Sequence, residues 1–567
     1  MKPDLFQNEL DALRNSAREF SKKYPALAPG LSGASTDPDV ERILQGTAFL
    51  SAGIREQLNT EFPDFAQSIL RTIAPDYLKD IPASTIVEFK PRTILNNPVT
   101  IKSGSRLDTS VSQDSNCRFS TCSDVNIHPI AIGSCEVSGD EKSTTIDLYL
   151  KNTSIANPNL SFDDLRFYIS GDYTNTSRIY YHIAENLKEI VVSSGPKEHV
   201  LDKSCCVMDG WSNDFALLES EGTSYSSYRR IQEYFINKNK FLFFTVNGFN
   251  TLASIPNAFK LSLILNTGVH NIKADKDTFR LFCTPAINIF DCDAEPITLH
   301  QRTSELPLKA ASNAGRHYTI HAIQSVHGQA RINSGKITYK NFNLSNKMSG
   351  TDPVYELIQH NVDKNYQDNI LRISYPGGFE NVSREILTVR LKCTNGYDTK
   401  ELKSGDVCIR THDIPDSISF SNVASVSDYV QPLTDGNILW NLISHLNVNY
   451  LPVADLTNLI SLLNLYNPTS RIDTREHAAN KKRIESIKDI QVNNEERILK
   501  GYLIRGKHIE VSIDGSGFLG TGDIFLFGEL LFFIFSQFSD INSFTRLTLI
   551  NNNNGERLQW LSKSVKN

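Results

Sequence analysis

The chain has 567 residues, of which 40% are hydrophobic and 22% charged, and its formal net charge is −6 at pH 7. This composition is ordinary for a soluble globular protein, and the length suggests roughly three to four domains. The small negative charge gives no general attraction to nucleic acid or to anionic membranes, so neither is expected as a partner.

Residues 1–82 predict a helical segment. Apolar residues recur at steps of four and three, which is the heptad pattern of a helix that packs along another helix. A single short helix is marginal in water, so this seam must be covered either by its own chain or by a partner subunit. Two more helices are expected, one beginning at the capping pair Asp37–Pro38 and one over Pro63–Ala74. The seam residues are Phe6, Leu10, Leu13, Ala17 and Phe20.

The middle of the chain predicts two β-rich domains, over residues 83–270 and 271–430. Short runs of alternating or β-branched residues, such as Ile86–Phe89, Ile146–Leu150 and Phe241–Val246, are separated by clusters of Asn, Ser, Gly and Asp. This texture is typical of short strands joined by turns.

Residues 431–567 predict a C-terminal domain of mixed α/β type. Helices are expected after Pro432 and after Asp455, whereas the charged stretch Arg475–Lys500 is expected to be partly exposed or loop-like. The apolar run Ile524–Phe538 is shorter than the roughly twenty residues of a membrane span and contains Glu529, so it predicts a helix buried in the core or in an interface. The chain as a whole therefore predicts a multidomain α+β protein. Strands are expected at Ile509–Ile513 and Leu547–Ile550.

No combination of residues predicts catalysis or a cofactor. Gly515, Gly517 and Gly520 have the spacing of a dinucleotide-binding loop, but little chain follows them. A turn into a buried helix is therefore favoured over a complete β-α-β cofactor unit with its acidic ribose ligand. His317 and His321 lie in a strand-like run, where they would be about 13 Å apart, too far for one zinc ion. They are expected to face solvent or an interface.

The nine cysteines predict reduced, mostly buried thiols rather than a disulfide framework or a metal site. Two pairs of cysteines lie close in sequence, Cys117 with Cys122 and Cys205 with Cys206. A structural zinc site needs a second matching pair downstream, and neither pair has one, so a zinc site is weakly supported. The N-terminus lacks the apolar core of a signal peptide. We therefore expect a cytoplasmic protein with free thiols, no metal and no cofactor.

The sequence resembles the TssF family of type VI secretion systems along nearly its whole length. The most specific run is DPDVERILQGTAFLSAGI, which begins at Asp37. Other blocks follow in the family's order and include Lys240–Phe244, Thr278–Asn288 and Ile541–Phe544. The chain departs from the family at Phe6-Gln7-Asn8, where an aromatic pair is often found, and in a middle region rich in Asn and Ser.

The resemblance implies a structural baseplate wedge subunit without enzyme activity. In this family two TssF copies join one TssG, and the unit binds TssK and the sheath-connecting TssE. The wedges surround the VgrG spike and start assembly of the Hcp tube and contractile sheath. The resemblance also implies contact with neighbouring wedges, and a cytoplasmic protein recruited to the inner-membrane-anchored complex without membrane insertion of its own.

The same resemblance favours an N-terminal bundle shared with partner subunits. A baseplate wedge protein of a phage tail or another contractile injection particle is the alternative interpretation. A β-rich hydrolase or carbohydrate-binding protein is a remote one, because no nucleophile motif or acid cluster supports it. The residues expected at the partner interface are Phe6, Leu10, Leu13, Ala17, Phe20, Val40, Ile43 and Leu44.

Overall fold

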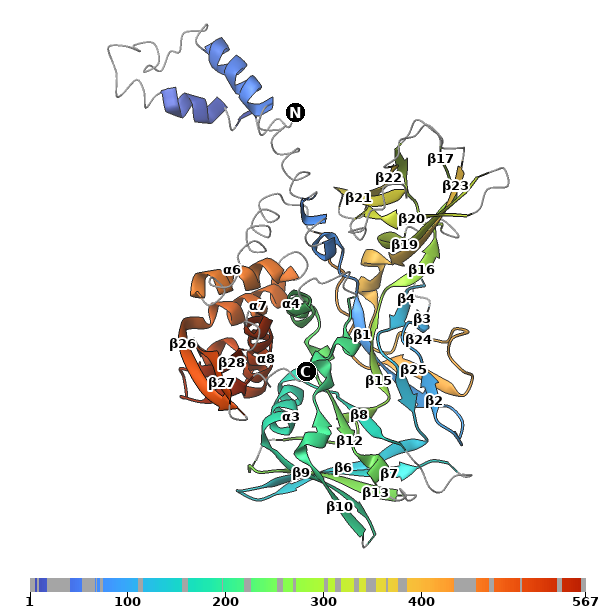
Figure 1. The fold of residues 1–567 in the computed structure, drawn as a ribbon, viewed down its shortest axis with the longest axis vertical. Helices are drawn as coiled ribbons and strands as arrows, with labels where there is room; N and C mark the ends of the chain where they lie inside the picture. Colours follow the sequence, from blue (N-terminus) through green and yellow to red (C-terminus); the bar gives the residue numbers. More distant parts are fainter. Residues whose placement is uncertain are drawn as a thin grey trace. The chain divides into compact units, whose positions relative to one another are not determined.

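The computed structural model groups the chain into two compact units (Figure 1). The first unit consists of residues 1–78 with 433–447, and the second of residues 79–432 with 448–567. The structure describes residues 6–7, 10–17, 41–53, 67, 69–71, 75–110, 116–154, 162–195, 197–218, 226–251, 258–268, 272–299, 304–311, 318–330, 336–342, 353–363, 366–375, 385–432, 455–468, 474–499, 502–537 and 543–561.

The described part of the first unit is helical, as the sequence predicts. Residues 10–17 and 41–53 form two helices, and residues 67 and 69–71 are helical as well. An ion pair between Arg14 and Glu41 joins the first two helices. A 3-10 helix, η2 (Pro75–Leu78), ends the segment. The helix expected after Pro432 lies outside the described residues.

A six-stranded sheet in the second unit joins distant parts of the chain. Its strand β1 pairs antiparallel with β15 on one side and β25 on the other, aligning Ser84 with Ile287 and Val87 with Asn422. The first six residues of β1 and all of β15 are buried, so both faces of these strands are covered. In sheet order the strands are β24 (Val407–Ile409), β3 (Arg106–Thr109), β4 (Arg118–Thr121), β15 (Cys283–Ile287), β1 (Ser84–Pro91) and β25 (Ile418–Asn422).

Residues 125–281 contribute a five-stranded and a four-stranded sheet. Buried and half-buried residues alternate along β7, so one face packs inward as the predicted strand Ile146–Leu150 requires. The first sheet runs β10 (Lys197–Asp202), β9 (Leu187–Ser194), β13 (Ala258–Leu265), β7 (Thr144–Asn152) and β6 (Ile130–Gly139), and the second β11 (Cys206–Val207), β12 (Phe243–Asn247), β8 (Asp164–Ile169) and β14 (Phe279–Leu281). Helices α3 (Tyr173–Asn186) and α4 (Ser226–Ile236) and the small pair β2 (Val99–Ile101) and β5 (Val125–Ile127) accompany them.

An eight-stranded sheet is built from residues 290–394 alone. The chain enters it through β16 and leaves through β23, and these two strands pair antiparallel. Leu371, Leu387, Val389 and Leu391 lie in its hydrophobic core. The strands are β16 (Phe290–Asp293), β17 (Ile297–Leu299), β18 (Glu305–Pro307), β19 (Thr319–Ala330), β20 (Ile337–Asn341), β21 (Val354–Asp363), β22 (Tyr366–Ser374) and β23 (Glu385–Thr394).

His321 lies in strand β19, as its alternating context predicts, but it does not face solvent. Its side chain is buried and its Nδ1 pairs with the buried carboxylate of Asp80. The expectation of a solvent or interface histidine is therefore wrong for His321, because a partner 241 positions away in the chain satisfies its ring nitrogen. His317 lies outside the described residues.

The C-terminal residues form helices and a four-stranded sheet. Strand β28 runs parallel to β27, and the apolar helix α8 connects them. Most of α8 is buried, which confirms the predicted buried helix. Among the described residues no helix is long and apolar enough to cross a membrane. The elements are α6 (Leu456–Tyr466), α7 (Thr474–Glu485), β26 (Ile487–Leu499), β27 (Tyr502–Ile513), α8 (Thr521–Gln537), β28 (Phe544–Asn551) and β29 (Arg557–Leu561).

The stretch Arg475–Lys500 is partly exposed, as expected, but it is not a loop: it forms helix α7 followed by strand β26. Much of α7 and β26 is exposed, so the abundance of charge reflects solvent contact rather than lack of structure. Exposed charges on an edge strand are a common protection against unwanted pairing, and β26 is at the edge of its sheet.

The glycines between β27 and α8 form a turn into a buried helix, as favoured from sequence. The chain that follows, through α8 and β28, completes a β-α-β connection. The start of α8 is occupied by acidic side chains: Asp523 accepts a hydrogen bond from Leu519 N at 3.1 Å, and Glu556 accepts one from Thr521 Oγ1 at 3.2 Å. These carboxylates occupy the positive end of the helix that a pyrophosphate would need.

Candidate functional site

The described residues do not bring together a metal site. Within them, no group of three or more His, Cys, Asp or Glu side chains could hold a metal ion. A cavity of about 420 Å³ is lined by Lys238, Glu476, Arg483 and Asp428, among other residues. Burial lowers the pKa of Lys238 to about 8, and Arg483 is already bound to Asp523. Because the wall carries both signs of charge, the cavity does not define a site for an anion or a cation.

An exposed apolar stripe on the helix of residues 41–53 is the first candidate surface for a partner. Ile43 and Leu50 are 68% and 67% exposed, and Phe49 beside them is 59% exposed. Ile43 and Leu50 are seven residues apart and therefore lie on one face of the helix. Gly46 lies on the same face with no atom near the position of an added Cβ. Contiguous exposed apolar residues of this kind mark interaction surfaces.

The opposite face of this helix is buried within the first unit. Ala48 and Ala52 are fully buried, and Leu10 of the neighbouring helix is only 4% exposed. The Arg14–Glu41 ion pair lies between the same two helices. The helix therefore has one face covered by its own unit and one face that remains open.

The eight interface residues predicted from sequence differ in their surroundings. Leu10 is buried, Ile43 is exposed, and Phe6, Leu13, Ala17 and Leu44 are half-buried. Phe20 and Val40 lie outside the described residues. The residues expected from sequence did not include the exposed Phe49 and Leu50, although the seven-residue spacing of Ile43 and Leu50 is a signal that could have added Leu50.

The β26–β27 hairpin carries the second candidate surface. Ile498 and Leu503 are directly opposed across the hairpin and are 77% and 60% exposed. Strand β27 pairs with β28 only from Gly506 onward, so the four residues 502–505 pair with β26 alone and extend past the sheet. We call Ile498 and Leu503 the hairpin tip. An apolar pair on such an extension is suited to insertion into another subunit.

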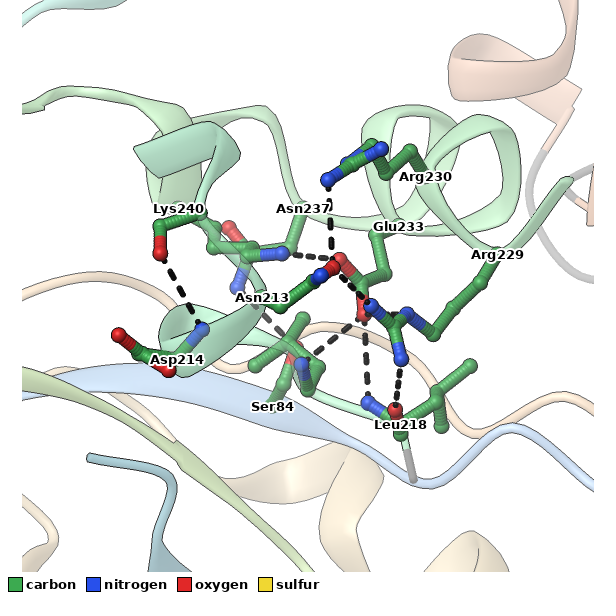
Figure 2. A network of polar contacts seen from close by, with 11 residues as sticks. Ser84, Asn213, Asp214, Leu218, Arg229, Arg230, Glu233, Asn237 and Lys240 are labelled. Atoms are coloured by element: carbon green, nitrogen blue, oxygen red, sulfur yellow. Dashed lines mark hydrogen bonds and ion pairs between the residues drawn. The ribbon is translucent and has the colours of Figure 1, made fainter. Parts of the chain in front are cut away.

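A buried polar network lies within the second unit (Figure 2). Its centre is Glu233 of α4, whose Oε2 pairs with the ammonium group of Lys240. The Oε1 atom accepts backbone N–H bonds from Leu217 at 2.9 Å and Leu218 at 3.2 Å. The side chains of Lys240 and Glu233 are 2% and 1% exposed, and burial lowers the pKa of Lys240 against the opposing effect of Glu233.

The same network reaches the six-stranded sheet. Asn237 Nδ2 donates to Ser84 Oγ at 3.1 Å, and Ser84 N donates to Ser427 Oγ at 2.9 Å. On the other side, Arg229 Nη2 donates to Asn213 Oδ1 at 3.0 Å (Figure 2). Asn237, which follows helix α4, strand β1 and the segment after β25 are thus joined by one buried and one part-buried hydrogen bond, which favours one fixed arrangement.

A second buried ion pair joins three helices. Arg483 Nε of α7 lies 3.0 Å from Asp523 Oδ2 of α8, and these side chains are 3% and 0% exposed. Tyr173 Oη of α3 donates to Asp523 Oδ1 at 2.9 Å. Each oxygen of this buried carboxylate is therefore hydrogen-bonded, as a buried charge requires.

Glu529, the carboxyl group inside apolar helix α8, is held by neutral hydrogen-bond donors. Trp211 Nε1 donates to its Oε2 at 2.6 Å and Tyr180 Oη at 3.2 Å. Burial raises the pKa of Glu529 to about 8, although both hydrogen bonds oppose this shift. The neutral form of Glu529 is therefore favoured in the folded protein at neutral pH.

Replacing Glu529 by glutamine should make the protein more stable at high pH. The pKa of Glu529 is about 8 in the folded protein and 4.5 as its ordinary value, so the folded state holds the proton more tightly than the unfolded state. The resulting contribution to stability is fully present below about pH 4.5 and is lost as the pH rises to about 8. The glutamine side chain keeps an acceptor oxygen but never ionises, so the variant should exceed the original protein by about 4–5 kcal/mol in unfolding free energy at pH 9. The two proteins should be nearly equal at about pH 4. Urea unfolding at both values measures this, and an equal difference at both would contradict it.

Comparison with known proteins agrees with this fold. The sequence model of the family "Type VI secretion system, TssF" matches residues 3–566. The chain is 25% identical to the type VI secretion system component TssF1 of Pseudomonas aeruginosa PAO1, over 99% of this chain and 98% of that protein.

Two solved structures share the fold. One is a chain of a type VI secretion TssK–TssF–TssG baseplate subcomplex, with a TM-score of 0.78 and 23% identity, covering 93% of this chain and 99% of that chain. The other is a chain of a type VI secretion baseplate complex, with a TM-score of 0.63 and 22% identity, covering 99% and 100%. Since the family match extends over nearly the whole sequence, the chain belongs to the TssF family of type VI secretion systems.

Proposed function

We propose that the chain is a non-enzymatic structural subunit of the baseplate wedge of a type VI secretion system. The observation that carries this proposal is the family match over residues 3–566. The multidomain fold, tied together by buried ion pairs and bearing exposed apolar surfaces, suits a part whose work is to hold other subunits in place. A rigid body of this kind can keep a contractile sheath extended until its interfaces rearrange.

The proposal includes partners. The similar solved subcomplex is one of TssK, TssF and TssG, which supports TssK and TssG as partners of this chain. Two copies of this chain would join one TssG, and the wedge would contact TssK, TssE, the VgrG spike and neighbouring wedges. The protein would act in the cytoplasm, recruited to the membrane-anchored complex through the baseplate. The division into segments 1–82, 83–270, 271–430 and 431–567 is part of the same proposal.

Affinity purification of the chain from its native cells tests the assembly. TssG and TssK homologues should be recovered with it in constant ratio. Deletion of the gene should stop sheath assembly and Hcp release while growth in rich medium stays normal. Normal Hcp release from the deletion strain would overturn the proposed baseplate role. Catalytic turnover of a substrate by the purified protein would overturn the proposal that the chain is not an enzyme.

The hairpin tip gives a local test of partner binding. Replacing Ile498 and Leu503 by aspartate should leave the thermal unfolding of the isolated chain unchanged, because both side chains are largely exposed. Recovery of partner subunits should fall about tenfold or more, since each large apolar side chain buried in a contact contributes about 1.5–3 kcal/mol. The matched control replaces Glu496 and Arg505, an exposed ion pair on the same hairpin, by glutamine. Equal recovery for both double variants would show that the tip is not an interface.

A further inference from the structure

The entrance and exit of the eight-stranded sheet each carry a cysteine. Strand β16 brings the chain in with Cys292, and strand β23 takes it out with Cys393. The strands pair so that Phe290 is opposite Cys393 and Cys292 is opposite Leu391. Because side chains alternate along a strand, Cys292 and Cys393 lie on the same face as diagonal neighbours.

The two thiols are within hydrogen-bonding distance of each other. The S–H of Cys393 donates to the Cys292 sulfur, which lowers the pKa of Cys292 to about 7 and raises the pKa of Cys393. Burial acts against ionisation of Cys292, while the charge of Arg118 favours it. The Arg118 guanidinium lies 5.2 Å from the centre of the Phe290 ring, at the same end of β16.

The two sulfurs differ in access to solvent. Cys393 is fully buried in the sheet core, whereas Cys292 is half-buried. The Cys292 sulfur also lies 3.4 Å from the carbonyl oxygen of Asp293 and 3.3 Å from that of Ala311. A small oxidant can therefore reach Cys292 first, and Cys393 lies diagonally beside it on the same face of the sheet.

We propose that Cys292 and Cys393 are a redox-responsive thiol pair that a hydroperoxide converts to a disulfide. The Cys292 thiolate attacks one peroxide oxygen, the O–O bond breaks, and hydroxide leaves from hydrogen peroxide, forming a sulfenic acid. The Cys393 sulfur then attacks the Cys292 sulfur, the S–OH bond breaks, and water leaves with the Cys393 proton. One peroxide is reduced to two waters as two thiols are oxidised to one disulfide.

This disulfide would link the strands through which the chain enters and leaves the eight-stranded sheet. It would join Cys292 to Cys393 and enclose the rest of the eight-stranded sheet in one covalent loop. Strand β16 has four residues and forms one edge of the sheet, so it is weakly held and can shift by the small amount that a diagonal pair needs to bond. Closing so long a loop restricts the unfolded chain and should stabilise the segment.

Mass spectrometry of the full-length protein tests the proposal. The reduced protein is treated with hydrogen peroxide in small excess, quenched with N-ethylmaleimide and digested without reductant. The expected product is a peptide that links Cys292 to Cys393 and is lost on treatment with dithiothreitol. Cys408, which is exposed, serves as the internal control and should be alkylated but not linked. Oxidation of Cys292 to sulfinic acid without the link, or a link formed only in urea, would overturn the proposal.

Two variants separate the roles of the thiols. In Cys393→Ser, Cys292 should stop at the sulfenic acid and react with dimedone, whereas in Cys292→Ser, Cys393 should stay reduced. Peroxide should raise the melting temperature of the original protein by a few degrees and leave that of Cys292→Ser unchanged. An equal shift in both proteins would mean that another oxidation is responsible and would count against the pair. Since the link is measured in the wild-type chain, poor folding of either variant does not affect the decisive result.

Discussion

Replacing Lys240 by methionine is expected to lower the free energy of unfolding by about 3–5 kcal/mol. The substitution keeps most of the length of the side chain and removes its charge, which leaves the carboxylate of Glu233 buried without its ammonium partner. Two backbone N–H groups still donate to Glu233, but its other nearby cation, Arg229, is 3.7 Å away. A buried charge without a close counter-charge is strongly destabilising.

Urea unfolding followed by tryptophan fluorescence measures this effect, because the ring of Trp211 lies 4.1 Å from that of Phe241, next to Lys240. The matched control is Arg372→Met, which breaks the exposed pair with Glu305 and should change stability by less than about 1 kcal/mol. A double variant, Lys240→Met with Glu233→Gln, removes both charges and should recover part of the loss. If the double variant is as unstable as the sum of the two single ones, Lys240 and Glu233 do not interact as the structure indicates.

Apolar periodicity predicted the helices and many strands correctly because it reflects burial on one face. The stretch Ile524–Phe538 had to be a buried helix whatever its partners were, and α8 is one. The run Ile146–Leu150 alternates in sequence and in burial along β7. Periodicity carried no information where a segment is exposed on most sides, so α7 and β26 were missed.

Pairings between distant residues could not be predicted from local pattern. Strand β1 pairs with strands roughly 200 and 330 positions later, and nothing in residues 84–91 indicates which. The same holds for His321, whose partner Asp80 lies in the segment before β1. Buried polar groups need specific partners, and one sequence does not reveal partners that the chain brings together only on folding.

The exposed apolar surface of the N-terminal helices was partly predictable. The N-terminal helices were expected to pack at least partly against other subunits, but the heptad pattern could not tell which face is covered by the chain itself. The structure buries Leu10, Ala48 and Ala52 and leaves Ile43, Phe49 and Leu50 exposed. The division of one helix into an inner and an outer face is therefore a result of packing rather than of pattern.

Replacing both Ile43 and Leu50 by aspartate is expected to abolish co-purification with TssG while the isolated chain unfolds at the same temperature. Each side chain is about two-thirds exposed, so aspartate there does not disturb the packing of the first unit. In a contact each would contribute about 2–3 kcal/mol by burial, and the introduced charges would weaken binding further. A loss above about 4 kcal/mol weakens an affinity roughly a thousandfold.

Two single variants complete the design, because they separate binding from folding on the same pair of helices. Gln45→Asp places a charge at an exposed polar position of the helix and should change neither assay. Leu10→Asp places a charge at a position that is 4% exposed, so it should lower the melting temperature and lose the partner only through unfolding. If Leu10→Asp loses TssG without any change in unfolding, the seam around Leu10 is itself the contact. If the double variant at Ile43 and Leu50 still recovers TssG, the exposed stripe is not the contact with TssG, and the proposed interface is wrong at these two residues.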